Sequence, residues 1–171
     1  RTKGYVLANS TTTALEIGDE PMLFHNKYPR VAVASCEERI VGIPHLLQDV
    51  PDLQTIILDD AFQHRVVRAG FNILLTDFSN LYPQDFFLPT GDLRDQWSSA
   101  KRAQIIIVTK CPYNLSAEAK QKIIRSLKPE ADQKVFFTTI EYGTPYHIAN
   151  RNDEWLITPR DEVLLVCGIA N

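Results

Sequence analysis

The stretch TIILDDAFQHR, residues 55–65, decides the fold of this chain. It begins with an apolar run that does not alternate with polar residues and that ends in two adjacent carboxylates, Asp59 and Asp60. Such runs are typical of strands buried on both faces, which belong to parallel sheets covered by helices. We therefore predict a strand over residues 55–60, with both aspartates at the carboxyl edge of the sheet, where open α/β sheets bind their ligands.

Other short apolar runs repeat this pattern, with helical segments between them. The further predicted strands are VAVAS (31–35), FNILLTDF (71–78), QIIIVTK (104–110) and VFFTTI (135–140). The predicted helices are EPMLFHNKY (20–28), EERIVGIPHLLQDV (37–50) and SAEAKQKIIRSL (116–127), and the second of these should break or kink at Pro44. Because strands and helices alternate, we predict an α/β fold with a mostly parallel sheet flanked by helices.

The last part of the chain departs from this alternation. Residues 141–162 carry alternating aromatic residues, a polar turn at 150–153 and two prolines, a pattern that suits an antiparallel hairpin or an interdomain linker. EVLLVCGIAN (162–171) then resumes the pattern of a buried strand. We expect a piece of a longer protein, with one domain over residues 1–150 and a linker hairpin plus the first strand of a second α/β domain over residues 151–171.

The composition excludes several classes of protein. The 171 residues are 44% hydrophobic and 23% charged, with a formal net charge of −3, as in an ordinary soluble globular protein rather than a disordered chain or a fibrous repeat. The three cysteines form no CxxC pair, which indicates neither a zinc site nor a disulfide framework. Basic residues are scattered, which disfavours nucleic-acid binding. No apolar run is long enough to span a membrane, so any membrane contact would be peripheral or lie outside this chain.

The adjacent aspartates admit two interpretations. In P-loop phosphotransferases a carboxylate at this point of the sheet holds Mg²⁺, because a hard cation that bridges two phosphates prefers oxygen ligands. Asp59 or Asp60 could instead cap a helix that starts near Ala61, which is at least as common in an arbitrary sequence. Gln63 and His64 favour the site, since they add two polar groups at the same edge.

Four other residues also have both a structural and a functional interpretation. Asp19, in GDEP (18–21), suits a helix N-cap better than a general base on the residues alone. Arg94, in the tight loop LPTGDLR (88–94), could offer a guanidinium fork to a phosphate or pair with Asp92 or Asp95. Arg39 is similarly ambiguous, and Lys110 could touch a nucleotide or simply be solvated.

Five motifs taken together resemble those of one enzyme family. GDEP, IILDDAFQHR, LPTGDLR, IIIVTK and CGIAN occur in an order that is similar to the tetraacyldisaccharide 4'-kinases, the lipid A kinases of Gram-negative bacteria. The resemblance runs from KGYVLAN (3–9) to the last residue. It implies a P-loop NTPase-like fold and transfer of the γ-phosphate of ATP, with Mg²⁺, to the 4'-hydroxyl of a tetraacylated disaccharide 1-phosphate. It also implies peripheral contact with the cytoplasmic face of the inner membrane.

The resemblance also implies roles for individual residues. Asp59 and Asp60 become a Walker B type pair that positions Mg²⁺ and the phosphates, and Asp19 becomes the candidate base on the attacking hydroxyl. It also implies that Gln63, His64 and Arg94 lie around the phosphate or acceptor pocket. Arg39, which follows VAVAS and Cys36, is a further candidate for substrate or phosphate binding on its position alone.

One departure from the family pattern limits what we expect of this chain alone. No GxxxxGK[ST] occurs in the 171 residues, and that loop holds the β and γ phosphates in P-loop enzymes. We therefore expect the full-length protein to be a kinase and this piece by itself to be inactive. The alternatives are another P-loop phosphotransferase for a sugar or nucleotide, and a noncatalytic binding domain that has lost the P-loop.

Overall fold

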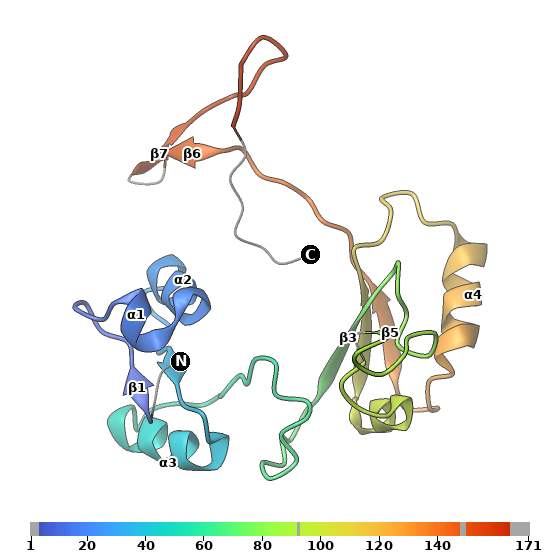
Figure 1. The fold of residues 1–171 in the computed structure, drawn as a ribbon, viewed down its shortest axis with the longest axis horizontal. Coiled ribbons are helices and arrows are strands. Elements are labelled where there is room, and N and C mark those ends of the chain that lie inside the picture. The colour runs from blue at the N-terminus through green and yellow to red at the C-terminus, as the bar shows by residue number, and fades with distance from the viewer. Residues whose placement is uncertain (1–3, 92, 148–149, 165–171) are drawn as a thin grey trace.

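The computed structural model describes residues 4–91, 93–147 and 150–164. Its N-terminal part contains two short strands and three helices, in the order β1 (Val6–Leu7), α1 (Ala14–Ile17), α2 (Asp19–Lys27), β2 (Ala34–Ser35) and α3 (Arg39–Asp49). β1 and β2 pair antiparallel, with Val6 opposite Ser35. Figure 1 shows these elements grouped on one side of the molecule, apart from a second group to which a long loop connects them.

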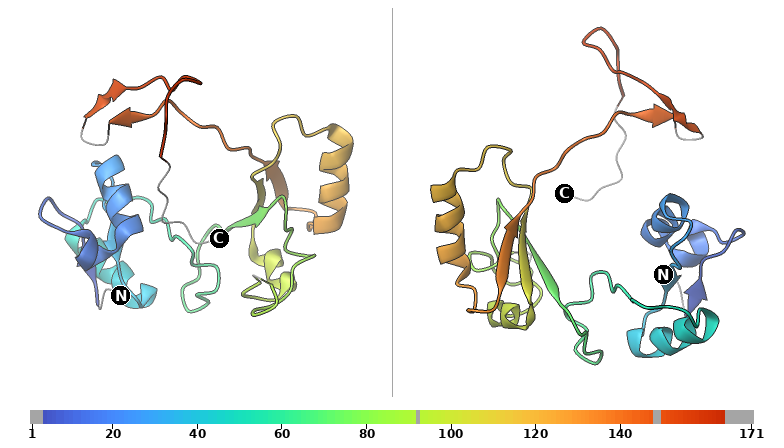
Figure 2. Two further views of the ribbon diagram at one scale, coloured as in Figure 1. Left: turned by 45° about the horizontal axis from the view of Figure 1, so that its top comes forward. Right: turned by 180° about the vertical axis from the view of Figure 1, so that it is seen from behind.

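The second group is built on a parallel sheet. β3 (Ile73–Asp77), β4 (Ile105–Thr109) and β5 (Lys134–Phe137) lie in the order β3-β4-β5, and both pairs are parallel. The 3-10 helix η1 (Trp97–Arg102) precedes β4, and α4 (Ala117–Leu127) connects β4 to β5 and covers one face of the sheet (Figure 2). Three predicted strands are confirmed, and so is the α/β fold class, which is consistent with a P-loop NTPase-like fold.

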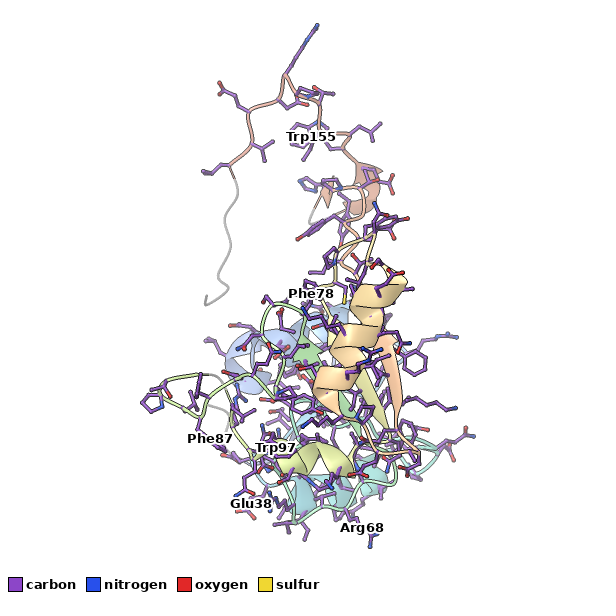
Figure 3. The ribbon with its side chains drawn as sticks, turned by 90° about the vertical axis from the view of Figure 1, so that its right-hand side faces the viewer. Glu38, Arg68, Phe78, Phe87, Trp97 and Trp155 are labelled. Carbon is purple, nitrogen blue, oxygen red and sulfur yellow. The ribbon has the colours of Figure 1, made fainter. Side chains whose placement is uncertain are left out.

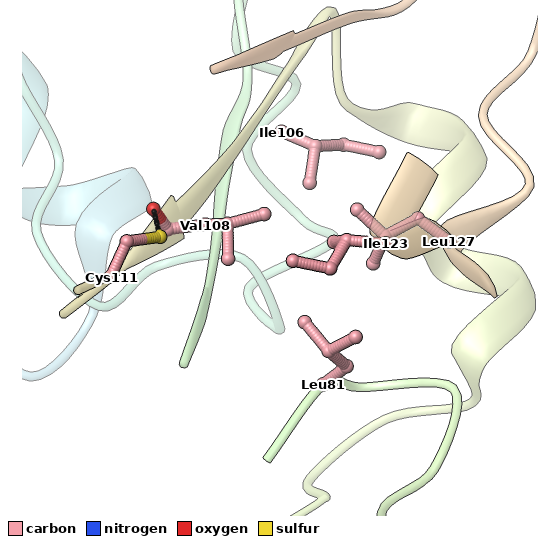
Figure 4. Packing of buried hydrophobic residues seen from close by; sticks show 6 residues of the cluster. All are labelled: Leu81, Ile106, Val108, Cys111, Ile123 and Leu127. Atoms are coloured by element: carbon pink, nitrogen blue, oxygen red, sulfur yellow. Dashed lines mark hydrogen bonds between the residues drawn. The ribbon is translucent and has the colours of Figure 1, made fainter. Parts of the chain in front are cut away.

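The hydrophobic core lies between α4 and the sheet. Ile106 and Val108 alternate along β4 so that both side chains point to the same face, and both are completely buried. Figure 4 shows them packed toward Ile123 and Leu127 of α4, with Leu81 closing the cluster from the loop after β3. The central strand of the sheet therefore anchors this half of the fold.

The amphipathic helix predicted at 116–127 is confirmed as α4. Ser116 caps it, since its side-chain oxygen accepts a hydrogen bond from the N–H of Ala119 at 3.2 Å. Ile123 and Leu127 are four residues apart and therefore share the buried face. The helix ends where Lys128 adopts a left-handed conformation with a φ of 48°.

Of the two outcomes expected at Pro44, a break or a kink, the break does not occur. α3 is continuous from Arg39 to Asp49 with Pro44 inside it. A proline inside a helix removes one backbone hydrogen bond and crowds the carbonyl four residues earlier, but the bonds of the other turns can still form. The helical bonds at the two ends remain, with Gly42 N–H to Glu38 O and Val50 N–H to Leu46 O both at 2.9 Å.

Two predicted strands do not join the parallel sheet. Residues 55–58, predicted as a strand, have no regular structure, and the described part of the sheet contains only β3, β4 and β5. The VAVAS run forms only the two-residue β2, which pairs antiparallel with β1. A strand exists only where a neighbour completes its hydrogen bonds, and the 55–58 segment has none among the described strands; its Ile57 side chain is 89% exposed.

The antiparallel hairpin predicted near residue 150 is present. β6 (Tyr146–His147) pairs antiparallel with β7 (Asn150–Glu154). The predicted polar turn at 150–153 is wrong in position, because these residues form β7. Residues 162–164, where the last predicted strand was expected to begin, have no regular structure, and residues 165–171 lie outside the described part. Among the described helices, none has the length and apolarity needed to cross a bilayer.

Candidate functional site

The two adjacent aspartates lie in what we call the acidic turn, residues 59–64. Asp60 has a φ of 44°, a left-handed conformation that aspartate tolerates better than most residues. Its N–H donates to Asp59 Oδ1 at 3.0 Å, and both side chains are exposed. No helix starts at Ala61 in this part of the structure, so the helix-cap interpretation of the pair is wrong.

An ion pair joins the acidic turn to a second predicted motif. Arg94 Nη1 donates to Asp60 Oδ2 at 2.8 Å, although the two residues are 34 positions apart. Arg94 thus contacts the acidic pair rather than its sequence neighbour Asp95, and Asp92 lies outside the described residues. The structure brings these two sequence-predicted site residues together without any strand at 55–60.

The loop that carries Arg94 is tight, as predicted. The N–H groups of Thr90 and Gly91 both donate to the carbonyl of Phe87, at 3.1 and 3.2 Å. A side chain at position 91 would clash with the carbonyl oxygen of Phe86, so glycine is required there. Figure 3 labels Phe87 on this loop and Trp97 where η1 begins, and the segment between them carries Arg94.

A second set of contacts, centred on Asp95, was missed by the sequence analysis. Arg65 Nη2 donates to both carboxylate oxygens of Asp95, at 2.9 and 3.0 Å. Arg102 Nη2, from η1, donates to Asp95 Oδ2 at 3.1 Å. The Arg102 guanidinium also lies over the ring of Phe62, 4.3 Å from its centroid. The only signal in the sequence is that both segments carry charges of both signs, with Arg65 at the end of DDAFQHR and Asp95 at the end of LRD.

Asp95 is held in its charged form. Partial burial raises the pKa of this carboxyl, but the hydrogen bonds from Arg65, from the Gln96 N–H and from Ser99 outweigh that effect, and the net result is a lowered pKa. Asp95 is therefore an anion across the neutral range and attracts both arginines.

Arg39 and His64 line one shallow pocket of about 300 Å³. The other lining residues are Glu37, Glu38, Ile40, Val66 and Val67. Arg39 Nη1 donates to the carbonyls of Cys36 and Glu37, at 2.7 and 3.3 Å, and so fixes the start of α3. Gln63 is exposed on the neighbouring acidic turn, where its carbonyl accepts the N–H of Arg65 at 3.0 Å.

Asp19 is the first residue of α2 and does not cap it. The N-cap is Gly18, whose φ of 103° favours glycine, and the cap has no side-chain hydrogen bond. The cap interpretation therefore lacks support, and the exposed Asp19 carboxylate gains only the favourable field of the helix N-terminus. Among the described residues no hydrogen bond or ion pair joins Asp19 to the acidic turn.

A further ion pair joins the carboxyl ends of β3 and β4. Lys110 Nζ lies 2.8 Å from Asp77 Oδ2, and Ser79 donates to Asp77 Oδ1 through its hydroxyl and its N–H, at 2.7 and 2.8 Å. Chiefly through the hydrogen bond from Lys110, these donors lower the pKa of Asp77 to about 2. Lys110 is thus paired with an aspartate rather than simply solvated.

Comparison with known proteins covers the chain from end to end. Residues 1–171 match the family described as tetraacyldisaccharide-1-P 4'-kinase. The chain belongs to this family.

Individual members of the kinase family are similar over the same range. The chain is 44% identical over 170 residues to the tetraacyldisaccharide 4'-kinase of Flavobacterium johnsoniae, covering 99% of the chain and 50% of that protein. It is 42% identical over 174 residues to the Cytophaga hutchinsonii protein of the same name, covering 100% and 48%. The chain thus spans about half the length of these curated relatives. No solved structure matches it significantly.

The acidic turn offers a small set of oxygen ligands. Across the described part of the chain, no group of three or more His, Cys, Asp or Glu side chains is arranged to hold a metal. Asp59 and Asp60 supply two exposed carboxylates. That donor set fits Mg²⁺, which is commonly bound through one or two carboxylates and completes its shell with water and substrate phosphates.

Replacing Asp77 with asparagine should lower the thermal stability of the chain in a pH-dependent way. Because the folded pKa of about 2 lies below the ordinary value of 3.8, Asp77 contributes stability above pH 3.8 that is lost as the pH falls through about 2. We expect the melting temperature of D77N to be lower than that of wild type at pH 5–7, by at most about 2–4 °C. Circular dichroism melts at several pH values, with D52N as an exposed control, measure this. A gap that does not narrow toward pH 2 would contradict the ion-pair origin.

Proposed function

We propose that this chain is part of an ATP-dependent kinase that phosphorylates the 4'-hydroxyl of tetraacyldisaccharide 1-phosphate in lipid A biosynthesis. The observation that carries the proposal is the family match over the whole chain. The Asp60–Arg94 contact supports it, because it unites two of the motifs on which the resemblance rests. Nothing observed favours another sugar or nucleotide kinase, or a noncatalytic domain.

In this proposal the acidic turn holds Mg²⁺ together with the phosphates of ATP. Asp59 and Asp60 are the proposed ligands, on the donor chemistry described above. The bound cation would supply neutralisation of charge on the phosphate oxygens. Arg94 already donates through Nη1 to Asp60, and its remaining donors suit an anionic phosphate beside the carboxylate.

The other polar residues near the turn are assigned to substrate. Gln63 is exposed on the acidic turn itself, and His64 and Arg39 share the shallow pocket beside it. Phosphoryl transfer depends mainly on positioning and electrostatic stabilisation. We assign to these residues the binding of phosphate or of the acceptor disaccharide. We also propose that the full-length protein works at the cytoplasmic face of the inner membrane in peripheral contact, since its proposed acceptor is a membrane lipid.

Asp19 is the proposed general base on the 4'-hydroxyl. Its carboxylate is exposed and is not used to cap α2, which is consistent with that role. Replacing it with asparagine should lower kcat of the full-length protein by about 10²-fold, while the affinity for ATP stays close to wild type. The matched control is E20Q, which removes the neighbouring exposed carboxylate in the same first turn of α2. A D19N variant with wild-type kcat would remove Asp19 from the mechanism.

The activity itself is tested on the full-length gene product that contains this chain. Purified protein is incubated with labelled ATP, Mg²⁺ and tetraacyldisaccharide 1-phosphate in detergent, and label in the lipid product is counted. We expect Mg²⁺-dependent transfer to this acceptor and none to free sugars or nucleosides. The 171-residue chain alone should give no product above a no-enzyme control. Transfer to the free sugars or nucleosides, but not to the lipid, would support the alternative kinase instead.

A further inference from the structure

Asp95 connects the chain just after the acidic turn to η1 and to the loop that precedes η1. Its carboxylate accepts hydrogen bonds from Arg65, which immediately follows the turn, from Arg102 of η1, and from the Gln96 N–H at 2.8 Å. Its side chain is 21% exposed, against 63% for Arg65. Asp95 is therefore the least exposed charge in the cluster and the one with the most hydrogen-bond partners.

Contacts after the acidic turn matter for its position, because the segment before it is not held in a sheet. Residues 55–58 are not a strand, so no sheet hydrogen bonds lead into Asp59. The contacts follow the aspartates instead. Phe62 lies beneath the Arg102 guanidinium, and Arg65 donates to both carboxylate oxygens of Asp95.

Arg94, the chain neighbour of Asp95, contacts the acidic turn as well. Its guanidinium is bonded to Asp60. The two ion pairs, Asp60–Arg94 and Arg65–Asp95, run in opposite senses between the same two segments. Such a reciprocal arrangement opposes sliding of one segment along the other, because any shift separates both pairs at once.

We propose that Asp95 is a positioning residue that holds Asp59 and Asp60 ready for Mg²⁺. This inference rests on the proposed function, in which the two aspartates are the metal ligands. When a binding-competent arrangement is only partly populated, the apparent dissociation constant rises by the inverse of that population. Loss of the Asp95 charge should therefore weaken Mg²⁺ binding and leave the chemical step intact once Mg²⁺ is saturating.

The test is the Mg²⁺ dependence of phosphotransfer by the full-length protein carrying D95N. We expect the Mg²⁺ concentration for half-maximal rate to rise about 5- to 30-fold, with kcat at saturating Mg²⁺ within about threefold of wild type. D95E, which retains the carboxylate, should restore most of the loss. R65Q removes one exposed partner of Asp95 and should shift the half-saturation in the same direction by a smaller factor.

The matched control is E130Q. It breaks an exposed ion pair made by η1, Lys101 Nζ to Glu130 Oε1 at 2.7 Å, that does not touch the acidic turn. A merely structural role for Asp95 would lower the active fraction, and with it kcat, without moving the half-saturation. Unchanged Mg²⁺ dependence in D95N and R65Q, or a loss confined to kcat, would overturn the inference.

Hydrogen exchange separates this inference from the proposed function. In full-length protein analysed by mass spectrometry, peptides covering residues 59–65 should exchange faster in D95N than in wild type or E130Q. If wild type transferred no phosphate, the kinase proposal would fail, while faster exchange in D95N would still support the positioning role of Asp95. Unchanged exchange in D95N would overturn the positioning role of Asp95 even in an active kinase.

Discussion

Full-length protein carrying D60N is expected to lose Mg²⁺-dependent phosphotransfer by about 10³-fold. Asp60 is one of the two proposed metal ligands, and its carboxylate is exposed and bonded to Arg94. Asparagine keeps the size and one oxygen of the side chain but removes the negative charge that a hard cation requires. Asparagine is also the appropriate substitution because, like aspartate, it tolerates the φ of 44° at this position, so the turn itself is preserved.

The size of this effect distinguishes metal binding from the loss of an ion pair. Asp60 and Arg94 are 70% and 59% exposed, and an exposed ion pair contributes about 1 kcal/mol or less. Breaking that pair alone therefore accounts for less than a tenfold loss, since tenfold corresponds to about 1.4 kcal/mol. A loss near 10³-fold requires that Asp60 acts on the reacting groups.

Two further variants make the comparison explicit. R94Q breaks the same ion pair but leaves the Asp60 carboxylate, so we expect it to lower turnover and, like R65Q, to raise the Mg²⁺ half-saturation by only a small factor. D52N neutralises an exposed aspartate in the preceding loop and should behave as wild type. Rates measured across a Mg²⁺ titration separate the three. If D60N and R94Q lose the same small factor, the acidic turn is not the metal site.

The sequence predicted those parts of the fold that depend on local burial. The runs at 71–78, 104–110 and 135–140 are strands, because each contributes side chains to a sheet that α4 covers. The run at 55–60 has the same apolar composition but no neighbouring strand to complete its hydrogen bonds. Composition reports the tendency of a segment to be buried; it does not report whether a partner is present.

The candidate site could be predicted only as separate motifs. The sequence pointed to Asp60 and Arg94, but the nearest acidic neighbours of Arg94 are Asp92 and Asp95, and proximity along the chain favoured those. The observed partner comes from 34 residues away, because a tight loop closed by Gly91 turns Arg94 toward the acidic turn. Asp95 was missed as a site residue for the same reason, since both of its arginine partners are brought to it by the fold.

The second large effect concerns stability: I106A should destabilise the chain by about 2–5 kcal/mol. Ile106 is completely buried in the central strand, with Leu74 beside it in β3 and Val135 in β5. Its side chain packs in the cluster that contains Ile123 and Leu127 of α4. Truncation to alanine removes buried apolar surface and leaves a cavity. The strands on both sides, β3 and β5, prevent that cavity from closing completely. Because domains are stable by only about 5–15 kcal/mol, the loss is a large part of the total.

Urea denaturation of the chain measures this effect against two matched variants. I106V removes a single methyl group at the same site and should cost about 0.5–1.5 kcal/mol. L75A makes a comparable truncation on β3, where the side chain is 63% exposed, and should change the free energy of unfolding by about 0.5 kcal/mol. Equal losses in I106A and L75A would mean that α4 does not cover the face of the sheet that carries Ile106. The parallel arrangement that places Asp77 and Lys110 at one edge would then have to be revised, because the same register pairs Ile106 with Leu74 and Thr109 with Asp77.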